Sequence, residues 1–499
     1  MIFVSAESYF KTAVSYLEGN TEDGQPHERN IDKAEAILNE ILNYNIGNAN
    51  VLYSLGSIQL AKGNYGFAIQ ILSQVTAMNP TNGSAWNNLG LAWKSVPDFA
   101  KAETALKQAV KYCDPEYRAD ILCNLAALNI NRNRAEQALA YCDKVMAIDP
   151  NHEKGKWHRG LARLELRQWA EGWDDHETRL MGGAPGEIAT RNYHGPDGMT
   201  PEWDGKSPGR IVIHGEQGIG DEIMFATCIA DALKVPGCEF IFEPSPRLEK
   251  LFARTFPTVK VYGTDDTDGR RWLGDLGRPD FKVALGSLPR FFRRSASAFP
   301  GQPYLVPDKA KRAWWGDKLR ALGRKPNIGI AWQGGVQQTR YDARSFHPLE
   351  YAPLFQSVDA NWISLQYDKT AQHCVQEVRE KLGVKLSHWP KAVEQKDPDT
   401  GKVSDIDELV ALVSKLDLVV SVCQTSIHVA GSLGIPTLCL TPSEPSWRYG
   451  AVEDDSMPWY SSVRLLRQAK DTADWAPVIQ DAAANVQAFL KVRNEASGE

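Results

Sequence analysis

Residues of the same kind recur every 34 positions over the first third of the chain, and few folds accommodate such a period. The recurring residues are Ala34, Ala68 and Ala102; Leu55-Gly56 and Leu89-Gly90; and Ala126 and Gly160. The spacing slips by two residues near Asp114-Pro115 and is then restored. Small residues let paired helices approach closely and leucines fill the seam between them, so the period predicts a stack of helical hairpins.

This array resembles the tetratricopeptide repeat, with about four units across residues 5–180. Pro80 and Pro150 close their units at equivalent places, because proline lacks an N–H and clashes with the preceding helical turn. The first unit is irregular, since the polar segment 19–30 indicates a loop inserted between its helices. Such units stack into a solenoid whose concave groove is expected to hold a peptide or protein partner. The alternative is an array that only packs on the rest of the chain or forms a dimer.

The composition is that of an ordinary globular protein. Of 499 residues, 43% are hydrophobic, and 56 Lys and Arg against 62 Asp and Glu leave a formal charge of −6, so a dedicated nucleic-acid binder is not expected. The length predicts about three domains. Eight cysteines without a C-x-x-C pair or zinc-like spacing indicate a reducing compartment. Without a signal-peptide pattern or a membrane-length apolar stretch, a cytoplasmic location is expected.

After residue 209 the pattern changes to short apolar runs that alternate with amphipathic segments, which is typical of parallel α/β architecture. The expected strands are 210–214, 239–242, 259–262, 327–332, 362–366, 384–387, 418–422 and 436–440. The expected helices are 221–233, 246–256, 349–355, 371–382, 406–416 and 426–433. The chain is thus predicted to be α + α/β, with a repeat array (1–180), a Gly- and Pro-rich linker (181–208), two Rossmann-like domains (209–308 and 309–475) and a C-terminal helix (476–499). Ligands of such sheets bind beyond the carboxyl ends of the strands, so the cleft between the two domains is the expected site.

The segment 214–222, directly after the first expected strand, is the first candidate for chemistry. Gly218 and Gly220 permit a tight turn and close approach to a ligand. Ile223 stands where a dinucleotide fingerprint needs its third glycine, which argues against an NAD-dependent oxidoreductase. Asp221 is interpreted either as a helix-capping residue or as a general base that takes a proton from an acceptor hydroxyl.

The second candidate segment is 421–428, at the junction of a buried strand and the following helix. Backbone N–H groups at that helix start, with the hydroxyls of Thr425 and Ser426, are suited to hold a diphosphate. His428 lies in the first helical turn, where it would either donate to a phosphate oxygen or serve a structural role.

The third candidate segment is 332–335, which also follows a strand. Gly334 and Gly335 with Arg340 and Arg344 suit recognition of a phosphate or carboxylate. The alternative is a surface loop with solvated charge.

Together and in order, these segments resemble bacterial proteins that join tetratricopeptide repeats to a glycosyltransferase domain. That domain is related to the lipopolysaccharide heptosyltransferases and more distantly to the protein O-GlcNAc transferases. The matching segments are GWDDHETR, Trp203-Asp-Gly205, HGEQGIGDEIMFA, GIAWQGG with RSF, ISLQ, LDLVVSVCQTSIHVAGSLGIPT, and PSWRYG with MPWYSSVRLLRQ. The resemblance covers nearly the whole chain. It implies a GT-B fold in which the C-terminal Rossmann-like domain holds a nucleotide-sugar and the N-terminal one presents the acceptor.

The resemblance also implies inverting, metal-independent transfer without a cofactor: a base deprotonates the acceptor while positive groups and helix dipoles stabilise the departing nucleotide diphosphate. Asp221 matches the base. The other matching positions are Gly218, Gly220 and Glu222 on the acceptor-side loop, and Gly334, Gly335, Arg344, Gln366, Gln424, Thr425, Ser426 and His428 around the donor.

One departure concerns the donor side, where many relatives read Ser-Val-Asp-Thr. Here Cys423-Gln424 replace Asp-Thr, so either Gln424 serves as a neutral substitute or donor binding is weakened or lost. Asp397-Pro-Asp399 mimics the D-x-D of metal-dependent transferases, but it lies in a polar loop and is discounted.

Two classes of function are therefore expected. The first is a glycosyltransferase that acts on a Ser or Thr hydroxyl of a protein captured by the repeats, such as a flagellin-like protein, or on a glycan or lipid-linked acceptor. The second is a non-catalytic scaffold with a degenerate transferase domain. The donor nucleotide, the sugar and the oligomeric state are not predicted by the sequence.

Overall fold

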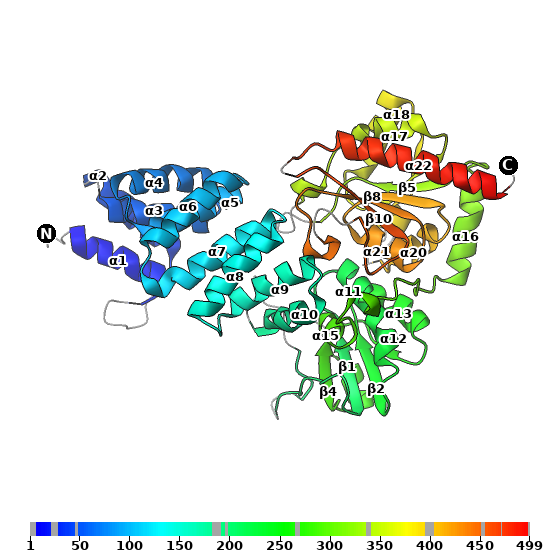
Figure 1. Ribbon diagram of the computed structural model, residues 1–499, viewed down its shortest axis with the longest axis horizontal. Helices are drawn as coiled ribbons and strands as arrows, with labels where there is room; N and C mark the ends of the chain where they lie inside the picture. The colour runs from blue at the N-terminus through cyan, green and yellow to red at the C-terminus, as the bar shows by residue number, and fades with distance from the viewer. Residues whose placement is uncertain are drawn as a thin grey trace. The chain divides into compact units, whose positions relative to one another are not determined.

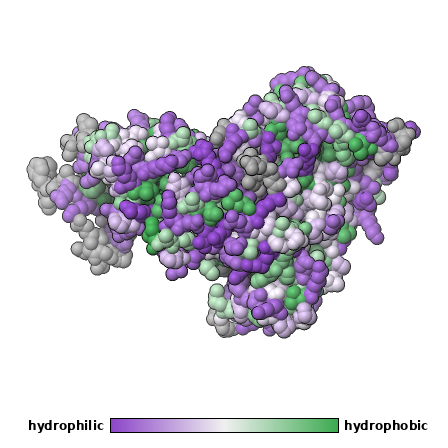
Figure 2. Space-filling model, viewed as in Figure 1, coloured by the Kyte–Doolittle hydropathy of each residue, from purple (hydrophilic) through white to green (hydrophobic). Residues whose placement is uncertain are grey.

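The computed structural model describes residues 6–20, 28–44, 48–181, 191–194, 198–264, 270–335, 341–394, 404–450, 455–470 and 472–497. Arg340 and Asp397-Pro-Asp399, which the sequence analysis discussed, lie outside the described residues. The chain forms two units, Met1–Arg159 and Gly160–Glu499. No helix in the described ranges is long and apolar enough to cross a membrane. Over the face seen in Figure 2, hydrophilic residues predominate and hydrophobic ones appear in scattered groups.

The first unit is built from consecutive pairs of helices (Figure 1). The pairs are α1 (Ala6–Glu18) with α2 (Ile31–Tyr44), α3 (Ala49–Ala61) with α4 (Tyr65–Met78), α5 (Gly83–Ser95) with α6 (Phe99–Tyr112), and α7 (Arg118–Asn131) with α8 (Ala135–Ile148). A fifth pair, α9 (Glu153–Glu165) with α10 (Trp169–His176), continues into the second unit. The described residues thus form five pairs where the sequence predicts about four units, and the predicted insertion separates α1 from α2.

The recurring small residues lie where two helices of a pair meet. A Cβ on Gly56 would come within 2.7 Å of Leu72 Cγ, and a Cβ on Gly90 would come within 2.7 Å of Leu106 Cγ. Ala102 is fully buried. The same close contact therefore repeats at the period seen in the sequence, which explains why small residues recur there.

The second unit contains two parallel sheets, as the alternating pattern predicts. The described strands of the first sheet run in the order β3 (Lys260–Val261), β2 (Cys238–Glu243), β1 (Gly209–His214) and β4 (Phe281–Ala284). Those of the second run β10 (Val463–Arg467), β9 (Thr437–Thr441), β8 (Leu418–Val422), β5 (Asn327–Ala331), β6 (Asn361–Ser364) and β7 (Leu386–His388). The sequence analysis did not find β4 and β10, which are short edge strands.

Helices cover both faces of the second sheet (Figure 1). On one face α17 (Ala352–Ser357) packs on the long C-terminal α22 (Ala476–Ser497), and α20 (Asp407–Val413) packs on α21 (Thr425–Ser432) on the other. The remaining helices of this sheet include α18 (Ala371–Leu382) and α19 (Pro390–Val393), and α16 (Lys309–Arg320) precedes β5. The apolar core lies between the sheet and α17, α18 and α22.

The strands of the first sheet alternate with shorter helices: α11 (Ile219–Phe225), α12 (Ile229–Ala232), α13 (Glu249–Thr255), α14 (Trp272–Leu276) and α15 (Leu288–Phe292). The prediction of one continuous helix over 221–233 is wrong, because a 3-10 turn, Ala226–Cys228, separates α11 from α12. At this turn the Thr227 hydroxyl donates to the Met224 carbonyl at 2.8 Å, a side-chain bond that competes with regular helix bonding.

Candidate functional site

The glycine-rich segment 214–222 and the hydroxyl-bearing segment 421–428 meet where α11 packs against α21. A Cβ on Gly220 would lie 2.9 Å from His428 Cδ2 and 3.6 Å from Thr425 Oγ1. The helix that follows the first sheet's β1 can therefore approach the helix that follows β8 only because residue 220 is a glycine. This contact joins the predicted acceptor side to the predicted donor side.

Asp221 uses its two carboxylate oxygens differently. One oxygen accepts the Gly218 N–H at 3.3 Å, which closes the first turn of α11. The other pairs with the guanidinium of Arg448, which also donates to Gln217 Oε1 at 2.9 Å and to Ser446 Oγ at 2.7 Å. The capping interpretation thus accounts for one oxygen. The other faces a cation from the second sheet's side of the site.

Arg448 is a site residue that the sequence analysis did not single out. It lies in the 3-10 helix Trp447–Tyr449, and its guanidinium stacks over the Trp447 ring at 5.0 Å. The signal was present, since Arg448 belongs to the matched segment PSWRYG, but nothing in the sequence indicated that this segment reaches Asp221.

His428 is buried in α21, and its Nδ1 lies 3.2 Å from the Tyr460 hydroxyl. Burial lowers the pKa of His428 to about 4, so the imidazole is neutral at neutral pH. Burial also raises the pKa of Tyr460, which keeps that hydroxyl protonated and able to donate to Nδ1. Nε2, the other ring nitrogen, is the one nearer to Gly220.

A cavity of about 190 Å³ opens at the start of α21. Its lining comes from both sheets' loops: Ile219, Arg247, Leu365, Tyr367, Val393, Ile406, Leu409, Gln424, Thr425 and Ser426. Three of the predicted donor-site residues, Gln424, Thr425 and Ser426, are therefore lining residues. The volume lies below the ~300–1,000 Å³ of pockets for whole drug-sized ligands, so it suits part of a nucleotide-sugar, such as a diphosphate.

Arg247 supplies the one cation among the described residues that line this cavity. It follows β2, its backbone carbonyl accepts the Ile406 N–H at 3.1 Å, and its Nε donates to the Ser404 carbonyl at 3.0 Å. The sequence analysis missed Arg247, although its position just beyond the carboxyl end of a strand was a usable signal.

Gln366 holds the loop that follows β5. Its Oε1 accepts the N–H groups of Trp332 and Gln333 at 3.2 and 3.1 Å, and its Nε2 donates to the Gln333 carbonyl at 3.2 Å. These bonds engage both polar atoms of the side chain, which is 1% exposed. Gln366 thus ties the loop after β5 to the segment after β6, in which its neighbours Leu365 and Tyr367 line the cavity.

The third predicted segment packs on the second through Cys423. A Cβ on Gly334 would come within 2.7 Å of the Cys423 carbonyl oxygen, and the Arg344 guanidinium donates to that oxygen at 3.2 Å. Gly335 adopts a φ of +85°, which favours glycine. None of these three predicted residues lines the cavity, but they shape the loop beside it.

The departure at Cys423-Gln424 places two side chains in different surroundings. The buried Cys423 Sγ lies 3.7 Å from Cys439 Sγ, inside the sheet, whereas Gln424 lines the cavity and its Nε2 donates to Ser421 Oγ at 3.4 Å. Ser421 Oγ is in turn 3.0 Å from Ser426 Oγ. Gln424 is therefore tied through Ser421 to Ser426, a second lining residue of the cavity.

Glu222 lies beneath the turn of the first segment and is buried. It accepts the Ser245 N–H at 3.0 Å, and a Cβ on Gly215 would come within 2.7 Å of its Oε2. Burial raises the pKa of Glu222 to about 8, so this carboxyl is protonated at neutral pH. It is suited to support the loop and not to carry a charge.

Replacing Glu222 by glutamine is expected to stabilise the protein above neutral pH. In the unfolded chain the carboxyl loses its proton near pH 4.5, whereas in the fold it keeps it up to about pH 8, so its contribution to stability falls as pH rises through this window. Chemical unfolding at pH 5 and pH 7.5 should show a gain for the variant that is about 3 kcal/mol larger at the higher pH. An equal effect at both pH values would contradict a protonated Glu222.

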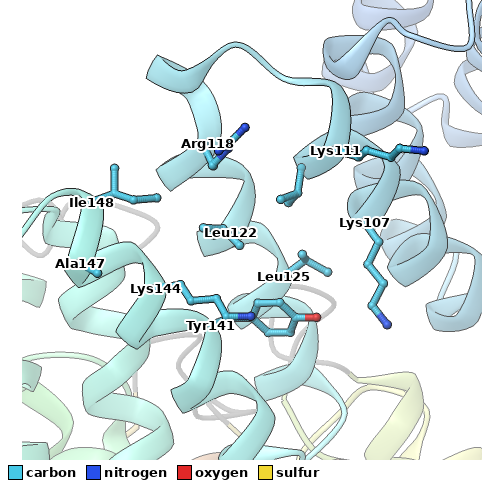
Figure 3. A pocket seen from close by; sticks show the side chains of 10 residues that line it. Lys107, Lys111, Arg118, Leu122, Leu125, Tyr141, Lys144, Ala147 and Ile148 are labelled. Atoms are coloured by element: carbon cyan, nitrogen blue, oxygen red, sulfur yellow. The ribbon is translucent and has the colours of Figure 1, made fainter.

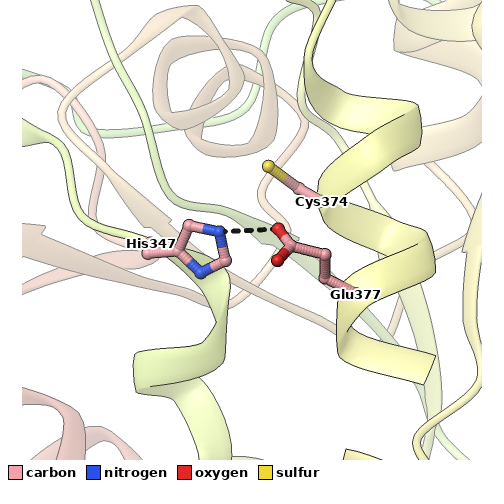
Figure 4. A group of neighbouring side chains, drawn as sticks. All are labelled: His347, Cys374 and Glu377. Carbon is pink, nitrogen blue, oxygen red and sulfur yellow. Dashed lines mark hydrogen bonds and ion pairs between the residues drawn. The ribbon is translucent and has the colours of Figure 1, made fainter. Parts of the chain in front are cut away.

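Among the described residues, one group of side chains has the composition of a metal site: His347, Cys374 and Glu377 (Figure 4). His347 Nε2 lies 3.0 Å from Glu377 Oε2, and Nδ1 accepts the Leu349 N–H at 3.3 Å. An Nδ1 that accepts leaves the proton on Nε2, which then donates to the carboxylate. Glu377 also pairs with Lys381 at 2.7 Å. The group is thus explained as a hydrogen-bonded link between α18 and the chain before α17.

The comparisons with known proteins agree with this architecture. The tetratricopeptide repeat family model matches residues 119–152, which confirms the repeat predicted there and spans α7 and α8. Protein FlbA of Caulobacter vibrioides is 28% identical over 442 residues, covering 85% of this chain and 70% of FlbA.

Two solved structures illustrate the two parts. MamA of Desulfovibrio magneticus RS-1 is 21% identical with a TM-score of 0.26 and covers 29% of this chain and 76% of its own. The E. coli ADP-heptose lipopolysaccharide heptosyltransferase II is 14% identical with a TM-score of 0.41 and covers 57% of this chain and 99% of its own. The helix pairs and the family match show an N-terminal helical repeat array resembling tetratricopeptide repeats, and the described strands form a C-terminal pair of parallel sheets, the combination that the sequence predicts.

Proposed function

We propose that the protein is a glycosyltransferase that moves a sugar from a nucleotide-sugar to an acceptor hydroxyl by an inverting, metal-independent reaction. The observation that carries the proposal is the cavity at the N-terminus of α21. Thr425 and Ser426 line it from one sheet, and Arg247 faces it from the other. A helix start with hydroxyls and an opposing guanidinium is suited to bind a diphosphate.

The donor's diphosphate would lie against the first turn of α21, where backbone N–H groups and the positive end of the helix dipole attract negative charge. Arg247 would neutralise the charge that develops as the nucleoside diphosphate departs. Gln424, in place of the carboxylate of many relatives, would contact the donor through its amide without adding a negative charge.

Asp221 would act as the base on the acceptor side. Because it is paired with Arg448 in this structure, proton transfer requires that the arginine release one carboxylate oxygen. A bound diphosphate offers a competing anion for the guanidinium. The released carboxylate would take the proton of the acceptor hydroxyl. The hydroxyl oxygen would attack the anomeric carbon of the sugar as the bond between that carbon and the diphosphate oxygen breaks.

The acceptor is proposed to be a Ser or Thr hydroxyl of a protein held by the repeats, because repeat arrays of this kind present extended surfaces to protein partners. A flagellin-like protein, a glycan and a lipid-linked acceptor are the acceptor classes suggested by the sequence resemblance. We place the reaction in the cytoplasm, where nucleotide-sugars are made and single thiols stay reduced.

Calorimetric titration of the full chain with UDP, GDP, ADP and CMP tests the proposal. One nucleotide is expected to bind with a Kd on the order of micromolar, and its affinity should be unchanged when EDTA is present. The identity of that nucleotide would define the nucleotide part of the donor. If the folded protein binds none of them, the proposed transfer fails and the chain is a scaffold, for which the Cys423-Gln424 replacement is the motivating observation.

A further inference from the structure

A groove on the repeat array is lined by positively charged side chains that the helical repeat does not need for folding. It has a volume of about 590 Å³ and lies between α6 and α8, with α7 beneath (Figure 3). Leu122 and Leu125 of α7 form its floor, and the side chain of Ile148, 48% exposed, stands at its edge. Leu122 and Leu125 are themselves buried, so the apolar surface that stays open to solvent comes from the exposed Ile148 and the half-buried Val110 and Tyr141. Such a surface marks a place where another molecule can gain contact.

Four cations surround this apolar floor. Lys107 and Lys111 come from α6, Arg118 begins α7, and Lys144 comes from α8; all four are exposed. Lys107 is already paired with Glu103 at 2.7 Å. No acidic side chain is among the described residues that line the groove, although the chain as a whole carries a formal charge of −6.

The preceding repeat provides an internal comparison. Helix α6 begins 34 residues after α4. Helix α8 begins 36 residues after α6, and the same step of 36 separates Leu89 of α5 from Leu125 of α7. At the positions equivalent to the four cations the chain has neutral residues: Ser73, Ala77, Asn82 and Gln108. The positive rim therefore belongs to this one groove and not to the repeat.

The groove lies on the face formed by the second helices of the pairs. The first helices α3, α5 and α7 contact one another in succession and so line the inner surface of the stack. The concave surface, where the sequence analysis placed the partner, is a different face.

We propose that this groove binds an acidic peptide segment of a partner protein that also carries apolar side chains. The apolar residues would pack on Val110, Tyr141 and Ile148. The carboxylates would pair with Lys111, Arg118 and Lys144. A nucleic acid offers no apolar side chains for the apolar lining of the groove, and a membrane surface is flat whereas these cations surround a hollow. The site goes beyond the proposed transfer reaction, and its occupancy does not depend on a donor nucleotide.

Fluorescence anisotropy with two labelled synthetic peptides tests the proposal on the full chain. One peptide repeats Glu-Glu-Leu-Leu and the other repeats Lys-Lys-Leu-Leu. Saturable binding of the acidic peptide alone is expected, and it should weaken as salt is added. The double variant Lys111→Gln/Arg118→Gln should weaken it by about tenfold, since two surface ion pairs are lost.

The matched control is Ser73→Glu/Ala77→Glu, which changes the net charge equally in the preceding groove at two exposed positions. It should leave the affinity unchanged. Equal loss in both double variants, equal binding of the two peptides, or no saturable binding would overturn the proposal. Tighter binding of anionic vesicles or of single-stranded DNA than of the acidic peptide would overturn it too. Nucleotide titration of the same protein reports separately on the transferase site.

Discussion

Asp221→Asn is expected to lower the rate of sugar transfer by a factor of about 10³ while the affinity for the nucleoside diphosphate is retained. The amide keeps the size of the side chain and can still accept the Gly218 N–H that closes the first turn of α11. It cannot take a proton from the acceptor hydroxyl. The measurement is the release of nucleoside diphosphate from the nucleotide-sugar that the titration identifies, at saturating donor.

The control for this variant is Asp359→Asn, which removes a carboxylate that is 79% exposed and pairs with Lys325 on the surface. Its turnover should match that of the native protein. Unchanged turnover of Asp221→Asn would exclude this residue as the base, whereas a parallel loss of nucleotide affinity would indicate that the variant disturbs the α11–α21 contact instead.

Arg247→Gln is expected to weaken binding of the nucleoside diphosphate by about 30- to 100-fold. Arg247 is the cation among the described lining residues of the cavity, so its removal leaves the phosphates facing only hydroxyls and backbone N–H groups. The affinity for the parent nucleoside, which carries no phosphate, should change little. Calorimetric titration with both ligands separates a loss of charge from a loss of structure.

Arg312→Gln, an exposed position on α16 of the same unit, is the matched control and should bind both ligands as the native protein does. Equal losses for nucleoside and diphosphate in Arg247→Gln would mean that the substitution damages the cavity wall, for example by releasing the Ser404 carbonyl. An unchanged diphosphate affinity would place the phosphates elsewhere.

The sequence was sufficient for features that depend on local spacing. A helical pair needs a small residue at its closest point, so the 34-residue recurrence of glycine and alanine revealed the repeats directly. Likewise, a buried parallel strand is a short apolar run, so β1, β2, β5, β8 and β9 were predicted to within a few residues. The edge strands β4 and β10 were missed.

The helical segment that follows β1 shows where this kind of reasoning stops. The segment 221–233 has a helical pattern. In the structure, however, the Thr227 hydroxyl donates to the Met224 carbonyl, and a 3-10 turn divides the segment into α11 and α12. The choice between a helix and a turn depends there on a competition of single hydrogen bonds, which a periodicity does not report.

The sequence by itself determined the order of the parts and which loops carry glycines, hydroxyls and charges at strand ends. Only the tertiary structure decided which of these residues meet: Arg448 reaches Asp221, Arg247 lines the same cavity as Thr425, and Gln366 bonds to the loop that follows β5. These partners are more than 30 to more than 200 positions apart in the chain. Their contact depends on how two sheets pack through α11 and α21, and no local spacing encodes that geometry.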